Sequence, residues 1–135
     1  MTGVFAEAIG GAIILIEHRY WGFSSPYEVL TTDNLRYLTL NQSIADLTHF
    51  ASTVKLPFDP HKTSVAAKAP WVLYGGSYAG ALTAWVASVS PGTYWAYIST
   101  SGVVEAISNF VSYASSIFCV ATNDRCPVGI LRPRN

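Results

Sequence analysis

Apolar residues in this chain gather into short continuous runs that alternate with stretches of helical periodicity. Residues 12–16 form a largely β-branched run without polar alternation, which is typical of a strand buried on both faces. Residues 71–74 form a second run of this kind, and residues 94–98 are a third strand candidate. We therefore expect three strands, separated by longer segments of different periodicity.

Three helices are predicted around these strands. Residues 2–9 fit the end of a helix that stops at a glycine pair. Thr39 can cap a second helix, because Gln42 follows three positions later as in a capping box and apolar residues then recur at helical spacing up to residue 54. A third helix is expected over residues 79–89, before a Pro-Gly pair.

The order strand, helix, strand, helix, strand predicts an α/β fold with central parallel strands and crossover helices. A parallel sheet of three strands is too small to stand alone, because both of its faces and both of its edges need cover. We therefore expect the sheet to be incomplete. The composition agrees, since 50% of the 135 residues are apolar and 12% are charged, against about 25% charged in an ordinary soluble domain. Larger proteins bury more of their surface and can carry such a composition, which suggests part of a larger body.

The balance of charge excludes two classes of protein. Eight basic and eight acidic residues give a net charge of zero, whereas a protein that binds nucleic acid through bulk charge has a basic excess. A disordered chain is richer in charged and polar residues.

The apolar stretch at the start contains Glu7 and has neither a basic segment nor a small-residue cleavage site. We therefore expect no signal peptide there and no membrane span, which needs ~18 apolar residues.

The two cysteines, Cys119 and Cys126, do not indicate a metal site. No second pair of cysteines or histidines accompanies them at the spacing of metal ligands. A local disulfide is expected if the chain is secreted, and free buried thiols are the alternative. The sequence leaves both open.

Residues 75–80, with the sequence Gly-Gly-Ser-Tyr-Ala-Gly, lie between a predicted buried strand and a predicted helix. This context is typical of the nucleophile elbow, in which a sharp turn projects a serine hydroxyl into a site. Ser77 is therefore the candidate nucleophile, and the backbone N–H of Tyr78 is a candidate oxyanion donor. The small residues that let strand and helix pack closely are Gly75, Gly76, Ala79 and Gly80. A glycine-rich turn with an incidental serine is the alternative.

A serine nucleophile needs a base, and the usual chain order is serine, acid, histidine. The three histidines all precede Ser77, at His18, His49 and His61. The acids that follow it are Glu105 and Asp124. Either the catalytic histidine lies beyond these 135 residues or the serine is not catalytic. His18 is either a structural hydrogen-bonding residue or part of a rearranged triad, and we expect the other two histidines to be solvated.

A second polar cluster follows the first apolar run and consists of Glu17, His18, Arg19 and Tyr20. Ionisable groups at the end of a buried strand are costly unless paired, and ligands bind near these ends in open parallel sheets. Glu17 and Arg19 would point to the same side of a strand, so they could pair with each other or with a neighbouring loop. Structural support of a site and direct contact with substrate are both open.

Together these segments resemble the Pro-X carboxypeptidase and dipeptidyl peptidase II family of serine peptidases. Residues 16–24 are similar to its EHRYYGxS signature, residues 37–47 to its YLTxEQALADL helix, and residues 75–80 to its GGSYGG elbow. Ala79 replaces a glycine of that elbow. The three motifs occur in the family's order, which makes the match specific.

The resemblance implies that residues 1–110 hold a partial α/β-hydrolase core with the elbow and that residues 111–135 form a divergent or cap-region tail. It implies cleavage of peptides at prolyl bonds with Ser77 as the acyl-forming nucleophile, without metal or cofactor, in a secreted or vacuolar/lysosomal protein. Members are often glycosylated, and Asn41 begins a sequon. Helix capping or solvent exposure explains Asn41 equally well. Because family members are several times longer, we expect this chain to be catalytically incomplete.

Two other functions remain open. A lipase or esterase would share the elbow but not the signature at residues 17–22. A non-catalytic truncated protein could serve as a binding module, although three strands alone would expose apolar faces and sheet edges.

Overall fold

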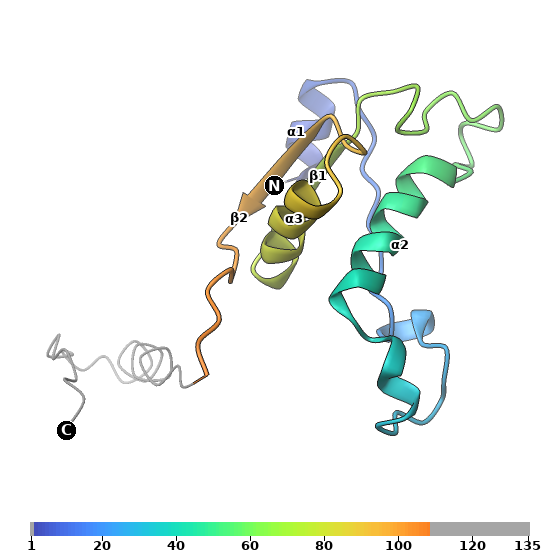
Figure 1. Ribbon diagram of the computed structural model, residues 1–135. Helices are drawn as coiled ribbons and strands as arrows, with labels where there is room; N and C mark the ends of the chain where they lie inside the picture. The colour runs from blue at the N-terminus through green and yellow to red at the C-terminus, as the bar shows by residue number, and fades with distance from the viewer. Residues whose placement is uncertain (1, 109–135) are drawn as a thin grey trace, which may run out of the picture. The chain divides into compact units, whose positions relative to one another are not determined.

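The computed structural model describes residues 2–108. The residues up to Val103 belong to one compact unit, in which three α-helices and two strands follow the order α1, α2, β1, α3 and β2 (Figure 1). Cys119, Cys126 and the tail predicted over residues 111–135 lie outside the described residues.

The first two helices form where the sequence predicts them. Helix α1 spans Thr2–Ala8, and the chain leaves it through Gly10 at a φ of 64°. Helix α2 spans Leu40–Thr53, and the side chain of Thr39 accepts a hydrogen bond from the N–H of Gln42 at 3.3 Å. The segment between them contains two short 3₁₀ helices, Gly22–Ser24 and Asn34–Tyr37. The capping pattern therefore sets the start of α2 as expected.

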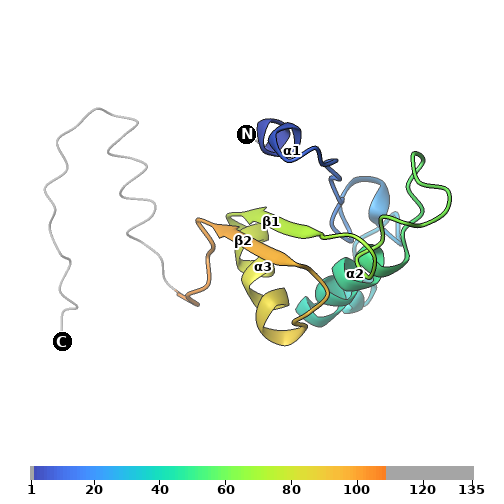
Figure 2. The ribbon, with the colours of Figure 1, turned by 90° about the horizontal axis from the view of Figure 1, so that it is seen from above.

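The two strands pair in parallel, and the helix between them lies on one side of the pair (Figure 2). The bounds of these elements are Val72–Gly76 for β1, Tyr78–Val89 for α3 and Ala96–Thr100 for β2. The register sets Gly75 opposite Ser99 and Gly76 opposite Thr100. The end of β2 therefore lies beside the residues where β1 turns into α3.

The strand predicted over residues 12–16 is not formed. Residues 11–18 have no regular secondary structure, and Leu15 is 90% exposed. The prediction was wrong because a strand exists only through hydrogen bonds to a neighbouring strand. None of the described residues pairs with this segment, so an apolar run that has the composition of a strand stays irregular.

The second strand begins two residues later than its apolar run predicts. The side chain of Tyr94 is buried, and its hydroxyl donates a hydrogen bond to the Leu47 carbonyl in α2 at 2.8 Å. The N–H of Trp95 then donates to the Trp71 carbonyl at 2.8 Å, just before the ladder starts. Tyr94 thus belongs to the contact with α2 and not to the sheet.

The hydrophobic core lies between α2 and α3. Its buried members are Ile44, Ala51, Leu82, Val86 and Tyr94. Leu73 and Tyr97 of the strands pack against this cluster, whereas Tyr74 is 48% exposed. The helices therefore cover one face of the two-stranded sheet. The alternate side chains of the strands, on the opposite face, point toward solvent.

The loop between α2 and β1 is held by a carboxylate. Asp59 is 8% exposed, and it accepts hydrogen bonds from the Thr63 hydroxyl at 2.8 Å and from the Ser64 N–H at 2.6 Å. Burial opposes ionisation, but these hydrogen bonds outweigh it and lower the pKa of Asp59 to about 2.

Over residues 2–108, no helix has the length and apolar character needed to cross a membrane.

Candidate active site

Ser77 is the single residue between β1 and α3. Its φ of 57° and ψ of −124° lie in a region that residues with a side chain rarely occupy, at a cost of about 1–3 kcal/mol. Such strain persists only where the surrounding contacts hold it in place. The turn has the sharp, strained form that the sequence pattern predicts, and Ser77 is exposed on it.

Two glycines let the strand and the helix approach each other around Ser77. A Cβ atom on Gly75 would collide with the carbonyl of Ala79. A Cβ atom on Gly80 would lie 2.6 Å from the carbonyl oxygen of Thr100. Both neighbours are backbone atoms that cannot move aside, so the tight turn requires glycine at these two positions.

Hydroxyl groups donate hydrogen bonds to carbonyls on both sides of Ser77. These bonds join Thr100 Oγ1 to Gly75 at 3.2 Å, Thr83 Oγ1 to Ala79 at 2.8 Å and Ser99 Oγ to Gly80 at 2.8 Å. The N–H of Ser77 itself donates to the Thr100 carbonyl at 3.0 Å. Sequence analysis did not identify these residues, although the Ser-Thr-Ser sequence after the third apolar run was a usable signal.

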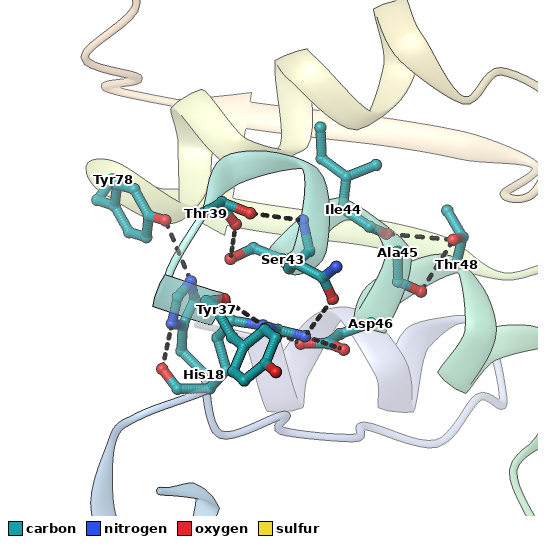
Figure 3. Close-up of polar contacts among 11 residues, drawn as sticks. His18, Tyr37, Thr39, Ser43, Ile44, Ala45, Asp46, Thr48 and Tyr78 are labelled. Atoms are coloured by element: carbon teal, nitrogen blue, oxygen red, sulfur yellow. Dashed lines mark hydrogen bonds and ion pairs between the residues drawn. The ribbon is translucent and has the colours of Figure 1, made fainter. Parts of the chain in front are cut away.

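Tyr78 is the first residue of α3, directly after Ser77. Its backbone N–H therefore has no carbonyl acceptor within the helix. Its hydroxyl lies 3.1 Å from Nε2 of His18 (Figure 3). The other ring nitrogen of His18 lies 2.8 Å from the Arg19 carbonyl. Because a carbonyl can only accept, Nδ1 of a neutral ring carries the proton and Nε2 accepts from Tyr78.

Arg19 connects the loop that carries His18 to helix α2. Its guanidinium donates to both carboxylate oxygens of Asp46, at 2.6 and 2.7 Å, and to the Tyr37 carbonyl at 2.5 Å. The hydrogen bond that Arg19 donates to Asp46 raises the pKa of Arg19, against the effect of burial. Gln42 accepts a further bond from Arg19 at 3.3 Å. Asp46 follows Gln42 by one helical turn, and this spacing could have indicated the shared face.

Of the two pairings left open for Glu17 and Arg19, the pair with each other is not formed. Glu17 instead accepts a hydrogen bond from the Ser24 N–H at 2.8 Å. Gly22, at a φ of 50°, leaves room for this carboxylate, since a Cβ there would collide with it. The strand geometry that would have brought the two side chains together is absent, because residues 11–18 form no strand. Arg19 pairs with a helix, and Glu17 closes its own loop.

Tyr20 anchors the same loop from inside. It is 7% exposed, and its hydroxyl donates to the Asn34 carbonyl at 2.6 Å. Its φ of 69° lies in the left-handed region, which reverses the chain between Arg19 and the 3₁₀ helix that follows. No two of the four side chains in this cluster thus share a hydrogen-bond partner.

Other candidate residues lie apart from the turn. His49 and His61 are exposed, as predicted, and Asn41 is exposed in the first turn of α2. Among residues 2–108, no three histidine, cysteine, aspartate or glutamate side chains are grouped as metal ligands.

A cavity of about 650 Å³ opens between residues 14–22, α2 and the start of α3. Glu17, His18 and Tyr78 line it from the polar side, and Leu73 and Tyr74 line it from the sheet. The cluster after the first apolar run and the residue after Ser77 therefore meet at one hollow, although the motifs are far apart in the sequence.

The sequence model of the family described as "Serine carboxypeptidase S28" matches residues 2–126. The chain belongs to the serine carboxypeptidase S28 family. This confirms the resemblance drawn from the three motifs and places the chain among serine peptidases.

Several curated proteins are similar to this S28 chain. A "Serine protease vicPa" of Bipolaris victoriae is 44% identical over 110 residues, which are 82% of this chain and 21% of that protein. A "Probable extracellular serine carboxypeptidase" of Arthroderma benhamiae is 36% identical over 119 residues, 88% of this chain and 17% of that protein. The "Thymus-specific serine protease" of Homo sapiens is 32% identical over 108 residues, 80% and 20% respectively. The chain spans about a fifth of the length of these relatives.

Proposed function

We propose that Ser77 is the nucleophile of a serine peptidase and that Tyr78 contributes its backbone N–H to the oxyanion hole. The observation that carries this proposal is the strained φ and ψ of Ser77 between a parallel strand and a helix. Membership of the S28 family supports it independently.

The reaction proceeds by acyl transfer. The Ser77 oxygen attacks the carbonyl carbon of the peptide bond while a base takes the hydroxyl proton. The Tyr78 N–H donates to the oxygen that becomes negative. The tetrahedral intermediate then collapses to an acyl-enzyme, and the amine leaves with the proton from the base. Water hydrolyses the ester in the same way and restores Ser77. These steps need only protein groups and water.

The base in this proposal is a histidine outside these 135 residues. Nε2 of His18 is engaged by the Tyr78 hydroxyl at 3.1 Å and Nδ1 by a carbonyl at 2.8 Å, which favours a structural role for this ring. The other two histidines are exposed on α2 and in the following loop. The 135 residues alone are accordingly proposed to be catalytically incomplete.

The unit is proposed to be the central part of an α/β-hydrolase core. Its strand–helix–strand arrangement with a nucleophile turn is the part of that fold that holds the serine. Leu15 and Tyr74 expose apolar surface around the cavity, which further sheet and helix residues would cover in a complete core. The residues Glu17, His18, Arg19 and Tyr20 support the site in this proposal by fixing the loop that reaches Tyr78.

The substrate is proposed to be a peptide with proline next to the scissile bond. The complete protein should be offered three substrates: a peptide ending in Pro-X, a peptide beginning with X-Pro, and a short ester. Cleavage of a prolyl peptide, abolished in Ser77→Ala and kept in Ser88→Ala, is the expected result. Hydrolysis of the ester alone would favour a lipase or esterase. No hydrolysis of any substrate would favour a non-catalytic protein.

The complete protein is further proposed to be secreted or vacuolar/lysosomal, with a glycan on Asn41. One relative is named as extracellular, and Asn41 is exposed in the structure. Treatment with a glycosidase should increase the electrophoretic mobility of the native protein and leave Asn41→Gln with a smaller shift. An equal shift in both would remove Asn41 from this proposal.

A further inference from the structure

We propose that Ser99 and Thr100, at the end of β2, are positioning residues that hold Ser77 in the geometry for attack. They act through the backbone of the turn. This inference rests on the proposed function of Ser77 and adds two residues that neither the elbow motif nor the polar cluster contains.

Thr100 contacts the turn through two different atoms. Its carbonyl oxygen accepts the N–H of Ser77 at 3.0 Å, and its hydroxyl donates to the carbonyl of Gly75 at 3.2 Å. One residue of β2 therefore fixes both the strained residue and the residue two positions before it. The backbone bond follows from the parallel register, whereas the hydroxyl bond is an addition that the sheet does not require.

Ser99 holds the helical side of the same turn. Its hydroxyl donates to the carbonyl of Gly80 at 2.8 Å. That carbonyl lies in the first turn of α3, where it also serves the helix, so the serine uses its second acceptor position. The approach is close, because a Cβ on Gly80 would lie 2.6 Å from the Thr100 carbonyl oxygen. The end of β2 thus bonds to the turn before and after Ser77.

Two hydroxyls inside helices, those of Ser88 and Thr53, make a different kind of contact. Ser88 and Thr53 each donate to a carbonyl four residues back in their own helix, which is a common local bond. Ser99 and Thr100 instead bond to residues 19 and 25 positions away, on α3 and β1. A strained residue keeps its conformation only when such surrounding contacts over-determine it. Ser99 and Thr100 provide these contacts at Ser77.

The test compares isosteric and conservative variants in the complete protein. Burst titration with an acylating ester counts the reactive Ser77 groups, and kcat and KM are then measured per titrated site. Thr100→Val should lower kcat about 10-fold with KM within about 2-fold, since small misplacements of a nucleophile are costly. Ser99→Ala should act in the same direction, and Thr100→Ser should restore most of the rate. The matched controls Thr53→Val and Ser88→Ala should stay within about 2-fold of the wild type.

The possible failures can be told apart. If wild-type Ser77 is not acylated at all, the proposed function fails and the positioning role fails with it. If Ser77 is acylated and both Thr100→Val and Ser99→Ala have wild-type kcat per titrated site, only the positioning role is wrong. A loss explained entirely by fewer reactive sites also overturns it, because that pattern reports folding. Should Thr100→Val not fold, Ser99→Ala decides alone, since Ser99 is exposed.

Discussion

Arg19 donates hydrogen bonds to both carboxylate oxygens of Asp46, at 2.6 and 2.7 Å. The two residues are 27 positions apart, and their contact joins the loop of the polar cluster to helix α2. A bidentate ion pair between arginine and a carboxylate is stronger and more directional than a single hydrogen bond. Because His18 precedes Arg19 and reaches Tyr78, the pair also fixes the loop beside the residue that follows Ser77.

Loss of this pair should destabilise the protein moderately. Asp46→Asn removes the charge and one acceptor. We expect the free energy of unfolding, measured in urea, to fall by about 1 kcal/mol. The cost is modest because the Asp46 side chain is 47% exposed, whereas that of Arg19 is 16% exposed. Asp33→Asn, at an exposed residue before a 3₁₀ helix, is the matched control. Equal unfolding free energies for the two variants would contradict this role.

Adjacent glycines in the turn should respond very differently to the same substitution. In Gly75→Ala the new methyl would collide with the Ala79 carbonyl, and we expect a loss of about 3 kcal/mol. In Gly76→Ala it would lie 3.3 Å from the Thr100 hydroxyl, a tight contact that we expect to cost about 1 kcal/mol or less. Denaturant unfolding of both variants measures the difference, and similar values would argue against the observed packing of the turn.

Asp59 should make stability depend on pH in the acid range. Its pKa in the folded protein is about 2, against an ordinary value of 3.8. A lowered pKa means that the ionised group stabilises the fold above pH 3.8 and that this contribution is lost as the pH falls toward about 2. The pH dependence of the unfolding free energy in this window should be weaker in Asp59→Asn. An unchanged profile would show that the hydrogen bonds from Thr63 and Ser64 do not favour the ionised form.

Tyr94 should titrate late and affect stability at alkaline pH. Burial, together with the neighbouring Tyr97, raises its pKa to about 12 from an ordinary value of 10.0. Stability from the neutral phenol is therefore present below pH 10.0 and lost as the pH rises toward about 12. Tyr94→Phe should remove the tyrosine ionisation that appears at the highest pH in an ultraviolet titration. It should also lower the free energy of unfolding by about 1 kcal/mol, because the hydrogen bond to Leu47 is lost. Tyr74→Phe, at an exposed residue, should leave that ionisation in place.

Elements set by local chemistry could be predicted from the sequence. The start of α2 follows from the Thr39 cap, the end of α1 from a glycine pair, and the turn at Ser77 from small residues between an apolar run and a helix. Each of these features depends on residues a few positions apart. The sequence carries their physical cause directly.

Features that depend on distant partners could not be predicted in the same way. Residues 12–16 have the composition of a strand, but none of the described residues pairs with them. The partner of Arg19 proved to be Asp46 and not Glu17, because the choice depends on how the loop meets α2. The hydroxyl bonds from Ser99 and Thr100 form only where the register sets the end of β2 beside the turn, and an apolar pattern does not specify that register.

The role of Ser77 is tested most directly by a covalent probe. The complete protein should be treated with a fluorophosphonate, digested, and examined by mass spectrometry for the modified residue. The account predicts one adduct, on Ser77, that disappears in Ser77→Ala together with peptide cleavage and persists in Ser88→Ala. An adduct on a different serine, or peptide cleavage that survives in Ser77→Ala, would contradict it.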